Sequence, residues 1–211
     1  MKHLKRFVIY ICGIFIIALG GILAIKSNLG ASPVSSLPLS ISRVSRLSLG
    51  TATIVLFTFY VLVQIILLRK NFNKVQLLQI VFAILFGQIM NLFNSIINIE
   101  VDHFYIKIII CLLSFFITAL GVFITITANI VPIAPDGLVQ VISLKSGIDF
   151  GKAKSYFDCV VVILSITLLL INGKSLEGIG IGTILSAILV GRIVFIINKY
   201  FKKALEKIIF S

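Results

Sequence analysis

Long apolar runs separated by short polar or basic segments dominate the chain. About 20 consecutive apolar residues are enough for an α-helix to cross the hydrocarbon core of a membrane. The first run is too long for the apolar part of a signal peptide, so we read it as an uncleaved span. The pattern predicts an all-α membrane protein with six transmembrane helices, at about 7–26, 50–68, 75–97, 105–127, 152–171 and 177–198.

Two interruptions of about twenty residues separate the first span from the second and the fourth from the fifth. One begins at Asn28 and contains Ser32 and Pro33, and the other begins at Asn129 and contains Pro135. Proline fits the first turn of a helix, where its missing N–H is no loss. A serine directly before it can act as the N-cap. We therefore predict a short helix beginning at each proline.

These short helices have two interpretations. As half-helices or re-entrant segments they would dip into the protein, because irregular backbone is tolerated at membrane depth only where it is buried or lines a wet cavity. Alternatively, each lies on the membrane surface. Both interruptions carry few charges, which favours the re-entrant interpretation.

The interruptions belong to a longer internal repeat. Its matching positions are Asn28 and Asn129, Gly50 and Gly151, each 101 residues apart, and Gly87 and Gly191, 104 apart. We divide the chain into repeats at 1–98 and 99–211, the second with a basic tail, within one membrane domain. Each repeat contains three spans. Because three is an odd number, the second repeat would enter the membrane from the side opposite to the first. The sequence predicts a 3+3 inverted repeat with two re-entrant or half-helix segments.

Composition and charge agree with a membrane protein. Apolar residues make up 59% of the chain and charged residues 12%, against about 25% charged in a soluble domain; mean hydropathy is +1.18. The net charge of +12 does not indicate a nucleic-acid partner, because the basic residues flank the apolar runs. With the N-terminus in the cytoplasm, 13 of the 19 Lys and Arg residues fall inside and 5 outside, which predicts that both termini are cytoplasmic.

Three charged residues are candidates for a substrate or ion site. Asp158 lies within the fifth span, where a carboxylate is costly and indicates function by default; the alternatives are a structural hydrogen bond or a hydrated position. Arg192 lies in the last span and either faces inward, where it could pair with Asp158, or snorkels toward the cytoplasm. Asp136 follows Pro135, where capping of the helix dipole is a sufficient explanation.

Several uncharged polar residues complete the candidate site. Gln88 and Asn91 recur at helical spacing in the third span and either line a polar path or bind helices together. Asn28, Asn129 and Ser32 stand at the starts of the interruptions. For a structural role we single out Pro33, Pro135, Gly50, Gly151 and Gly182, the last within a series of small residues typical of helix packing.

No motif indicates an enzyme. The three cysteines and two histidines show no metal-ligand spacing, and the chain lacks the HExxH, GxSxG and P-loop patterns. We therefore expect no catalytic residue, no metal and no cofactor.

Taken together, four motifs resemble the YczE/YyaS/YitT-like family of bacterial integral membrane proteins. The resemblance implies a small multi-pass protein of the bacterial inner membrane, in a family whose members mostly lack an assigned function. The motifs are Gly30-Ala31-Ser32-Pro33, Ala134-Pro135-Asp136-Gly137-Leu138, Gly151 to Asp158, and Gly178-Ile179-Gly180-Ile181-Gly182-Thr183 to Gly191.

The reading we prefer is a small transporter or permease for an unidentified small solute, working by alternating access about the inverted repeat. The two half-helices would approach each other from opposite sides, with Asp158 beside them. Alternatives are a membrane substrate-binding subunit like the S component of an energy-coupling-factor importer, or a non-transporting accessory protein. The partners expected are the lipid bilayer and a small molecule or ion, and a homodimer is a candidate assembly.

Overall fold

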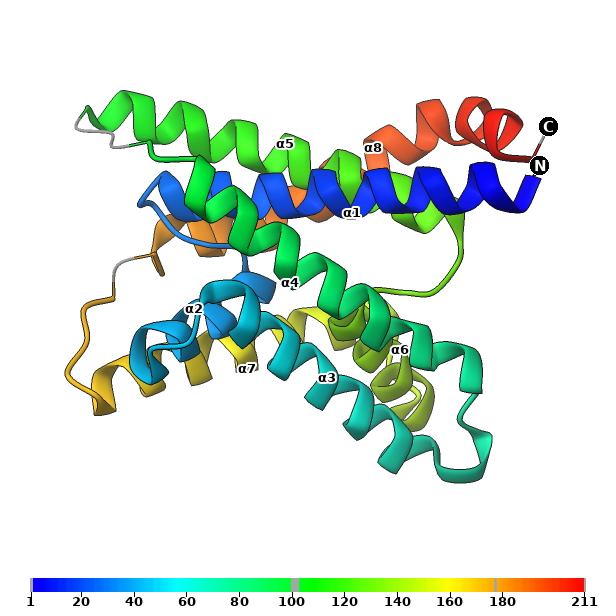
Figure 1. Cartoon of the computed structure of the whole chain (residues 1–211), viewed down its shortest axis with the longest axis horizontal. Helices are drawn as coiled ribbons and strands as arrows, with labels where there is room; N and C mark the ends of the chain where they lie inside the picture. Colours follow the sequence, from blue (N-terminus) through cyan, green and yellow to red (C-terminus); the bar gives the residue numbers. More distant parts are fainter. Residues whose placement is uncertain (1, 100–102, 177, 211) are drawn as a thin grey trace. The chain divides into compact units, whose positions relative to one another are not determined.

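The computed structural model describes residues 2–99, 103–176 and 178–210. Over these residues the chain forms eight α-helices, two short 3-10 helices and no strand (Figure 1), which confirms the all-α class. In chain order they are α1 Lys2–Lys26, α2 Pro33–Ser45, α3 Leu49–Leu68, η1 Arg69–Asn71, η2 Lys74–Leu77, α4 Leu78–Ile96, α5 Phe104–Ala128, α6 Ala134–Ser146, α7 Phe150–Ile171 and α8 Ile181–Phe210.

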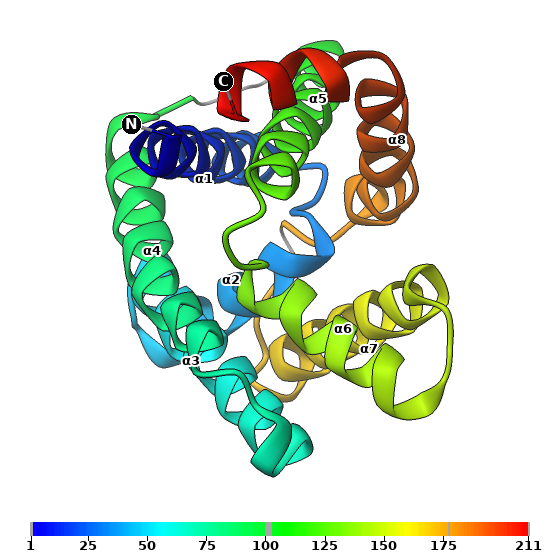
Figure 2. The ribbon, with the colours of Figure 1, turned by 90° about the vertical axis from the view of Figure 1, so that its right-hand side faces the viewer.

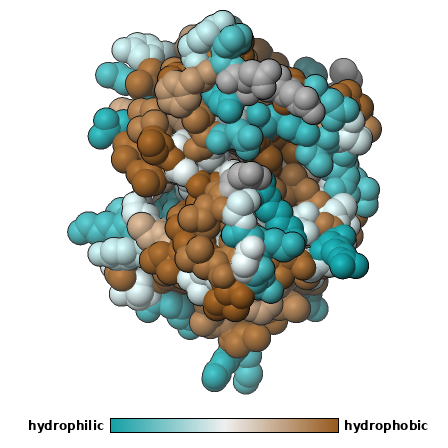
Figure 3. Space-filling view, turned by 90° about the vertical axis from the view of Figure 1, so that its left-hand side faces the viewer, coloured by the Kyte–Doolittle hydropathy of each residue, from teal (hydrophilic) through white to brown (hydrophobic). Residues whose placement is uncertain are grey.

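Among the described residues, six helical segments are long and apolar enough to cross a membrane. They are Leu4–Lys26, Leu49–Asn71, Lys74–Ile96, Phe104–Ala128, Phe150–Ile171 and Ile181–Ile209. Many of their large apolar side chains are exposed, and Figure 3 shows apolar side chains over much of one face of the molecule. The chain is a multi-pass membrane protein with the six spans in the predicted order.

The last span differs most from its prediction. It begins at Ile181 instead of residue 177, because Gly178 has a φ of +79° and lies in a turn before the helix. The helix also continues past residue 198 through its basic end.

Both interruptions contain the predicted short helices. Helix α2 begins at Pro33, and α6 begins at Ala134 with Pro135 directly after it. In α2 every residue from Ser35 to Ser40 is buried. A helix lying on a surface would bury one side only, so this burial favours an interior position.

The described residues cluster into two compact units, and each unit draws helices from both predicted repeats. Unit 1 contains α1, α5, α8 and the end of α4. Unit 2 contains α2, α3, most of α4, α6 and α7. The compact units therefore cut across the sequence division at residue 98.

In unit 1, α1 and α5 pack as antiparallel neighbours, side by side in Figures 1 and 2. A Cβ added to Gly13 would lie 2.7 Å from Thr125 Cγ2, and one added to Gly121 would lie 2.7 Å from Ile17 Cγ1. Gly20 in turn packs against Thr118. The last two contacts are reciprocal, because Gly20 and Gly121 are 101 residues apart and so are Ile17 and Thr118. Such exchange of equivalent contacts is the signature of a local two-fold axis.

In unit 1 the first interruption is also hydrogen-bonded to the first turn of α8 and to the turn that precedes it. The Ala31 amide donates to the Gly178 carbonyl at 2.7 Å, and the Gly182 amide donates to the Leu29 carbonyl at 2.9 Å. Gly30, at a φ of +142°, has no room for a side chain here. Gly180 and Gly182 thus pack against the loop at Leu29, and Gly182, inside α8, also faces Cys111 of α5, which is the expected kind of contact between helices.

In unit 2, each short helix turns back into the long helix after it, and the two hairpins are built alike. We call α2–α3 hairpin 1 and α6–α7 hairpin 2. The Ser42 hydroxyl donates to the Leu47 carbonyl in hairpin 1, and the Ser143 hydroxyl donates to the Ile148 carbonyl in hairpin 2, both at 2.7 Å and 101 residues apart. The short helix of each hairpin also packs on the long helix of the other: α2 packs on α7, and α6 packs on α3.

Candidate functional site

One face of α7 carries the polar residues of the candidate site. Lys154, Asp158, Val161 and Ser165 follow one another at spacings of four, three and four residues, which places them on the same side of the helix. Val161 and Ser165 are buried, and the Asp158 side chain is only 13% exposed. This stripe faces the interior of unit 2.

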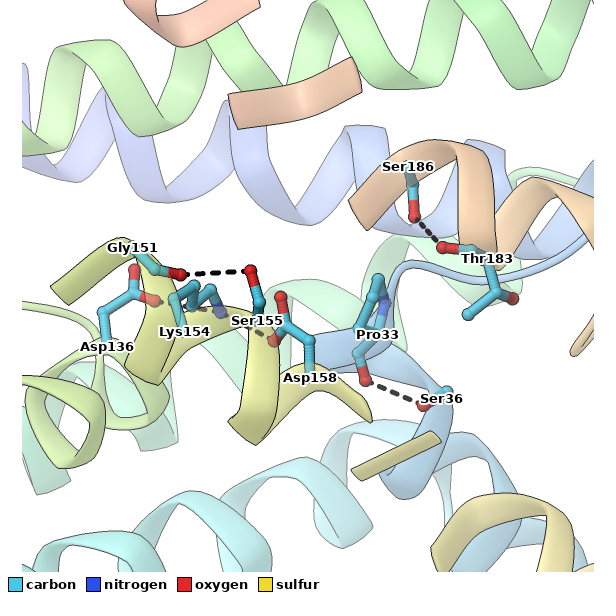
Figure 4. Close-up of polar contacts among 9 residues, drawn as sticks. All are labelled: Pro33, Ser36, Asp136, Gly151, Lys154, Ser155, Asp158, Thr183 and Ser186. Carbon is cyan, nitrogen blue, oxygen red and sulfur yellow. Dashed lines mark hydrogen bonds and ion pairs between the residues drawn. The ribbon is translucent and has the colours of Figure 1, made fainter. Parts of the chain in front are cut away.

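A cluster of three charges forms between the first turn of α6 and the second and third turns of α7. The Lys154 ammonium lies 2.9 Å from Asp158 Oδ1 and 3.2 Å from Asp136 Oδ1. Both carboxylates point toward the lysine in Figure 4. Asp136 therefore does more than complement a helix dipole, because it also ties α6 to α7. With all three groups ionised the cluster carries one net negative charge.

Aromatic rings border the charged cluster. The Lys154 ammonium lies 5.7 Å from the centre of the Phe157 ring, within the range of a cation–π contact. The Tyr60 ring of α3 packs edge-on against Phe157 with the ring centres 5.5 Å apart. Tyr60 is itself buried. The aromatic rings of Phe157 and Tyr60 thus form an apolar border on one side of the charged cluster.

The other end of the α7 stripe reaches the first half-helix. The hydroxyls of Ser36 and Ser165 lie 3.0 Å apart, and Ser36 also donates to the Pro33 carbonyl at 2.7 Å (Figure 4). Helix α7 therefore contacts both half-helices, α6 through Lys154 and α2 through Ser165. The two half-helices are connected through this shared neighbour.

Two buried glutamines, neither of them among the candidates predicted from the sequence, hold the start of α6. Gln64 Nε2 donates to the Ala134 carbonyl at 3.2 Å and to Gln79 Oε1 at 3.0 Å. Both glutamines are almost fully buried, and Gly137 packs directly against Gln79. The available signal was a single polar residue inside the apolar run of the second span.

These contacts repeat with the same offset of 101 residues. Gln64 bonds to the start of α6, and Ser165, its counterpart, bonds to the start of α2. The charges do not repeat. The positions that correspond to Asp136, Lys154 and Asp158 are occupied by Ser35, Thr53 and Phe57. The hydrogen bonds to the starts of the short helices therefore occur in both repeats, whereas the three charged residues occur only in the second.

The structure brings together Asp136 and Asp158, but it gives Arg192 a different position. Asp158 forms its ion pair with Lys154, one of the 13 Lys and Arg residues that the charge pattern predicts to be cytoplasmic. Arg192 belongs to unit 1 and is exposed. Within unit 2 the Asp158 carboxylate is therefore paired with Lys154, and the conditional pairing of Asp158 with Arg192 stays a prediction.

The polar candidates divide into exposed residues and residues that join helices. Asn28 and Asn129 are exposed turn residues with left-handed φ angles of 59° and 49°. Gln88 is also exposed. Asn91 accepts a hydrogen bond from the Gly50 amide at 2.7 Å and so binds α4 to α3.

The remaining candidates lie at the starts of helices. Ser32 is half-buried directly before Pro33. Pro135 is buried in the first turn of α6. Gly151 is exposed and donates its amide to Asp149 Oδ1 at 2.9 Å. Among the described residues no group of three or more His, Cys, Asp or Glu side chains could hold a metal ion.

Comparison with known proteins identifies one family. A family model described as "Family of unknown function (DUF6198)" matches residues 4–199, so the chain belongs to this family. No curated protein and no solved structure matches the chain. The resemblance to the YczE/YyaS/YitT-like proteins stays a prediction.

Proposed function

We propose that this member of the DUF6198 family is a small transporter or permease that carries a small solute across a membrane. The observation that supports it most is the cluster of Asp136, Lys154 and Asp158. Two of these residues belong to a candidate span, Phe150–Ile171. Charged side chains inside a span are costly to insert and typically mark a substrate or ion path.

The reciprocal contacts support an inverted repeat as the basis of transport. Helices α1 and α5 are antiparallel and exchange equivalent contacts, so the local axis that relates them lies across the helices. If both helices cross a membrane, that axis lies in the membrane plane. Inverted repeats of this kind permit alternating access around a site built from half-helices.

The chemistry of the cluster favours a small ion or zwitterion as the solute. The carboxylates of Asp136 and Asp158 can bind a cationic group, and the Lys154 ammonium can bind an anionic group. Half-helix N-termini also favour anions. A zwitterion would satisfy both kinds of partner. We propose that the protein acts without chemical turnover and without a cofactor.

We place the protein in the bacterial inner membrane with both termini in the cytoplasm. The orientation rests on the excess of Lys and Arg on one side of the spans. The resemblance to the YczE/YyaS/YitT-like proteins implies the same location.

The test begins with a thermal-shift screen of amino acids, small organic acids and alkali cations on detergent-purified protein. A compound that raises the unfolding midpoint is then offered to proteoliposomes that contain wild type, Asp158→Asn or Glu206→Gln. Glu206 is a half-buried acid near the C-terminal end of α8, outside the proposed site, and serves as the control. We expect Asp158→Asn to abolish uptake and Glu206→Gln to leave it unchanged. Uptake by Asp158→Asn at the wild-type rate would refute the proposed site and favour an accessory role.

A further inference from the structure

The two hairpins of unit 2 have equivalent structures but differ in how much neighbouring residues cover them. At the start of the long arm, Leu49 of hairpin 1 is 5% exposed, whereas its counterpart Phe150 in hairpin 2 is 41% exposed. Gly50 is buried and its counterpart Gly151 is exposed. Within unit 2, the start of the long arm is therefore less covered in hairpin 2 than in hairpin 1.

Hairpin 1 is held by close neutral contacts with α4. The Gly50 amide donates to Asn91 Oδ1 at 2.7 Å, and a Cβ at Gly50 would overlap the Gly87 carbonyl oxygen. At Gly151 the corresponding Cβ would meet only Asp149 Oδ1, at 3.1 Å. Within unit 2 no described helix covers Gly151 as α4 covers Gly50.

The arms of hairpin 2 are joined by charge instead. Lys154 of α7 pairs with Asp136 of α6 at 3.2 Å, and both side chains keep about a quarter to a third of their surface exposed, 26% and 31%. An ion pair between partly exposed side chains contributes little net free energy, so this pair can break at a small cost. In hairpin 1 the matching positions hold Ser35 and Thr53, which cannot form an ion pair.

The ends of the two arms are anchored to different neighbours. Helix α6 is tied to α3 by the bond from Gln64 to the Ala134 carbonyl, and α7 is tied to α2 by the bond between Ser165 and Ser36. Loss of the ion pair would leave α6 attached to α3 and α7 attached to α2. The arms of hairpin 2 could then separate while both anchors stay intact.

We propose that Lys154 is an ionic latch that holds the arms of hairpin 2 closed, and that this hairpin is the mobile gate of unit 2. Hairpin 1 is its fixed counterpart. The latch is a property of the protein without solute, so it can be tested whether or not transport is found.

The experiment is hydrogen–deuterium exchange on the full chain in detergent, read by mass spectrometry. Local opening raises the exchange of the helices that open. In wild type, peptides from 134–146 should exchange faster than the matching peptides from 33–45. In Lys154→Met we expect exchange in 134–146 to rise about two- to fivefold, the factor that an ion pair of this exposure supports, with 33–45 unchanged.

The control variants separate the latch from a general loss of charge. Lys152→Met removes an exposed lysine two residues away and should leave both regions unchanged. Lys154→Arg keeps the pair and should exchange like wild type. Asp136→Asn breaks the latch from the other arm and should reproduce Lys154→Met, which keeps the test decisive if one variant folds poorly. Equal exchange of the two short helices, or an equal effect of Lys152→Met, would overturn the proposal.

Discussion

Replacing Gly50 by alanine should destabilise the protein, while the same change at Gly151 should not. The two glycines are 101 residues apart and each lies near the start of a long helix. A Cβ on Gly50 would overlap the Gly87 carbonyl oxygen and lie 2.6 Å from Asn91 Cγ. Because one of these neighbours is backbone, α3 and α4 must separate to admit the methyl group.

The expected cost follows from two terms. Forcing an extra methyl group into a packed contact costs about 1–3 kcal/mol. The separation also weakens the hydrogen bond from Gly50 to Asn91, and an interhelical bond in a membrane protein contributes about 0.6 kcal/mol on average. Subtracting the gain of about 0.5–1 kcal/mol that alanine brings to any helical glycine position, we expect Gly50→Ala to lower the free energy of unfolding by about 1–3 kcal/mol.

Gly151→Ala provides the matched control. Its Cβ would meet only a flexible carboxylate, Asp149 Oδ1 at 3.1 Å. Alanine also loses less chain entropy than glycine when a helix forms, which favours the folded state by about 0.5–1 kcal/mol. We expect stability within about 1 kcal/mol of wild type.

The measurement is an SDS titration in mixed micelles followed by circular dichroism, because the chain has no tryptophan to report by fluorescence. The midpoint should fall for Gly50→Ala and stay near wild type for Gly151→Ala. Equal midpoints for the two variants would show that the close contact between α3 and α4 is wrong.

Three further predictions concern topology, the charged cluster and the buried glutamines. A reporter that is active only in the periplasm should be silent when fused to the C-terminus, because the positive charges place that end inside; an active fusion would reverse the orientation. Asp158→Asn should fold and express near wild type while losing solute uptake, and loss of the folded protein on size-exclusion chromatography would make its role structural. Gln64→Leu should lower stability by about 0.6–1.7 kcal/mol in the SDS titration. Ser165→Ala, which removes one hydroxyl, should lower stability by less. A larger loss of stability for Ser165→Ala than for Gln64→Leu would contradict the proposed role of the glutamine pair.

The sequence was sufficient for the helices because their signals are local. Pro33 and Pro135 mark the starts of two short helices whatever surrounds them, since proline fits the first helical turn. The offset of 101 residues likewise predicts equivalent positions such as Asn28 and Asn129, and both adopt left-handed backbone angles in the structure. Apolar run length gave the six spans for the same reason.

The partners within the site needed the fold. Asp158 stood out as an acid inside a span, but Lys154 lay among flanking basic residues and was counted as a determinant of orientation. Only the packing of α6 against α7 brings the lysine to Asp136. Gln64 could not be assigned to the site because one polar residue in an apolar run does not indicate which other helix it contacts; in the structure this is the start of α6.

The composition of the two compact units has a consequence for how the protein is made. Helix α1 can pack against its main partner, α5, only after synthesis has passed residue 128. Hairpin 1 likewise can pack against α7 only after synthesis has reached Ile171. During that interval the glycine face of α1 has no native helix against it and must be shielded by lipid or by the insertion machinery. A fragment that stops at residue 98 cannot build either unit, whereas the fragments 1–98 and 99–211 produced together in one cell contain every helix that both units require.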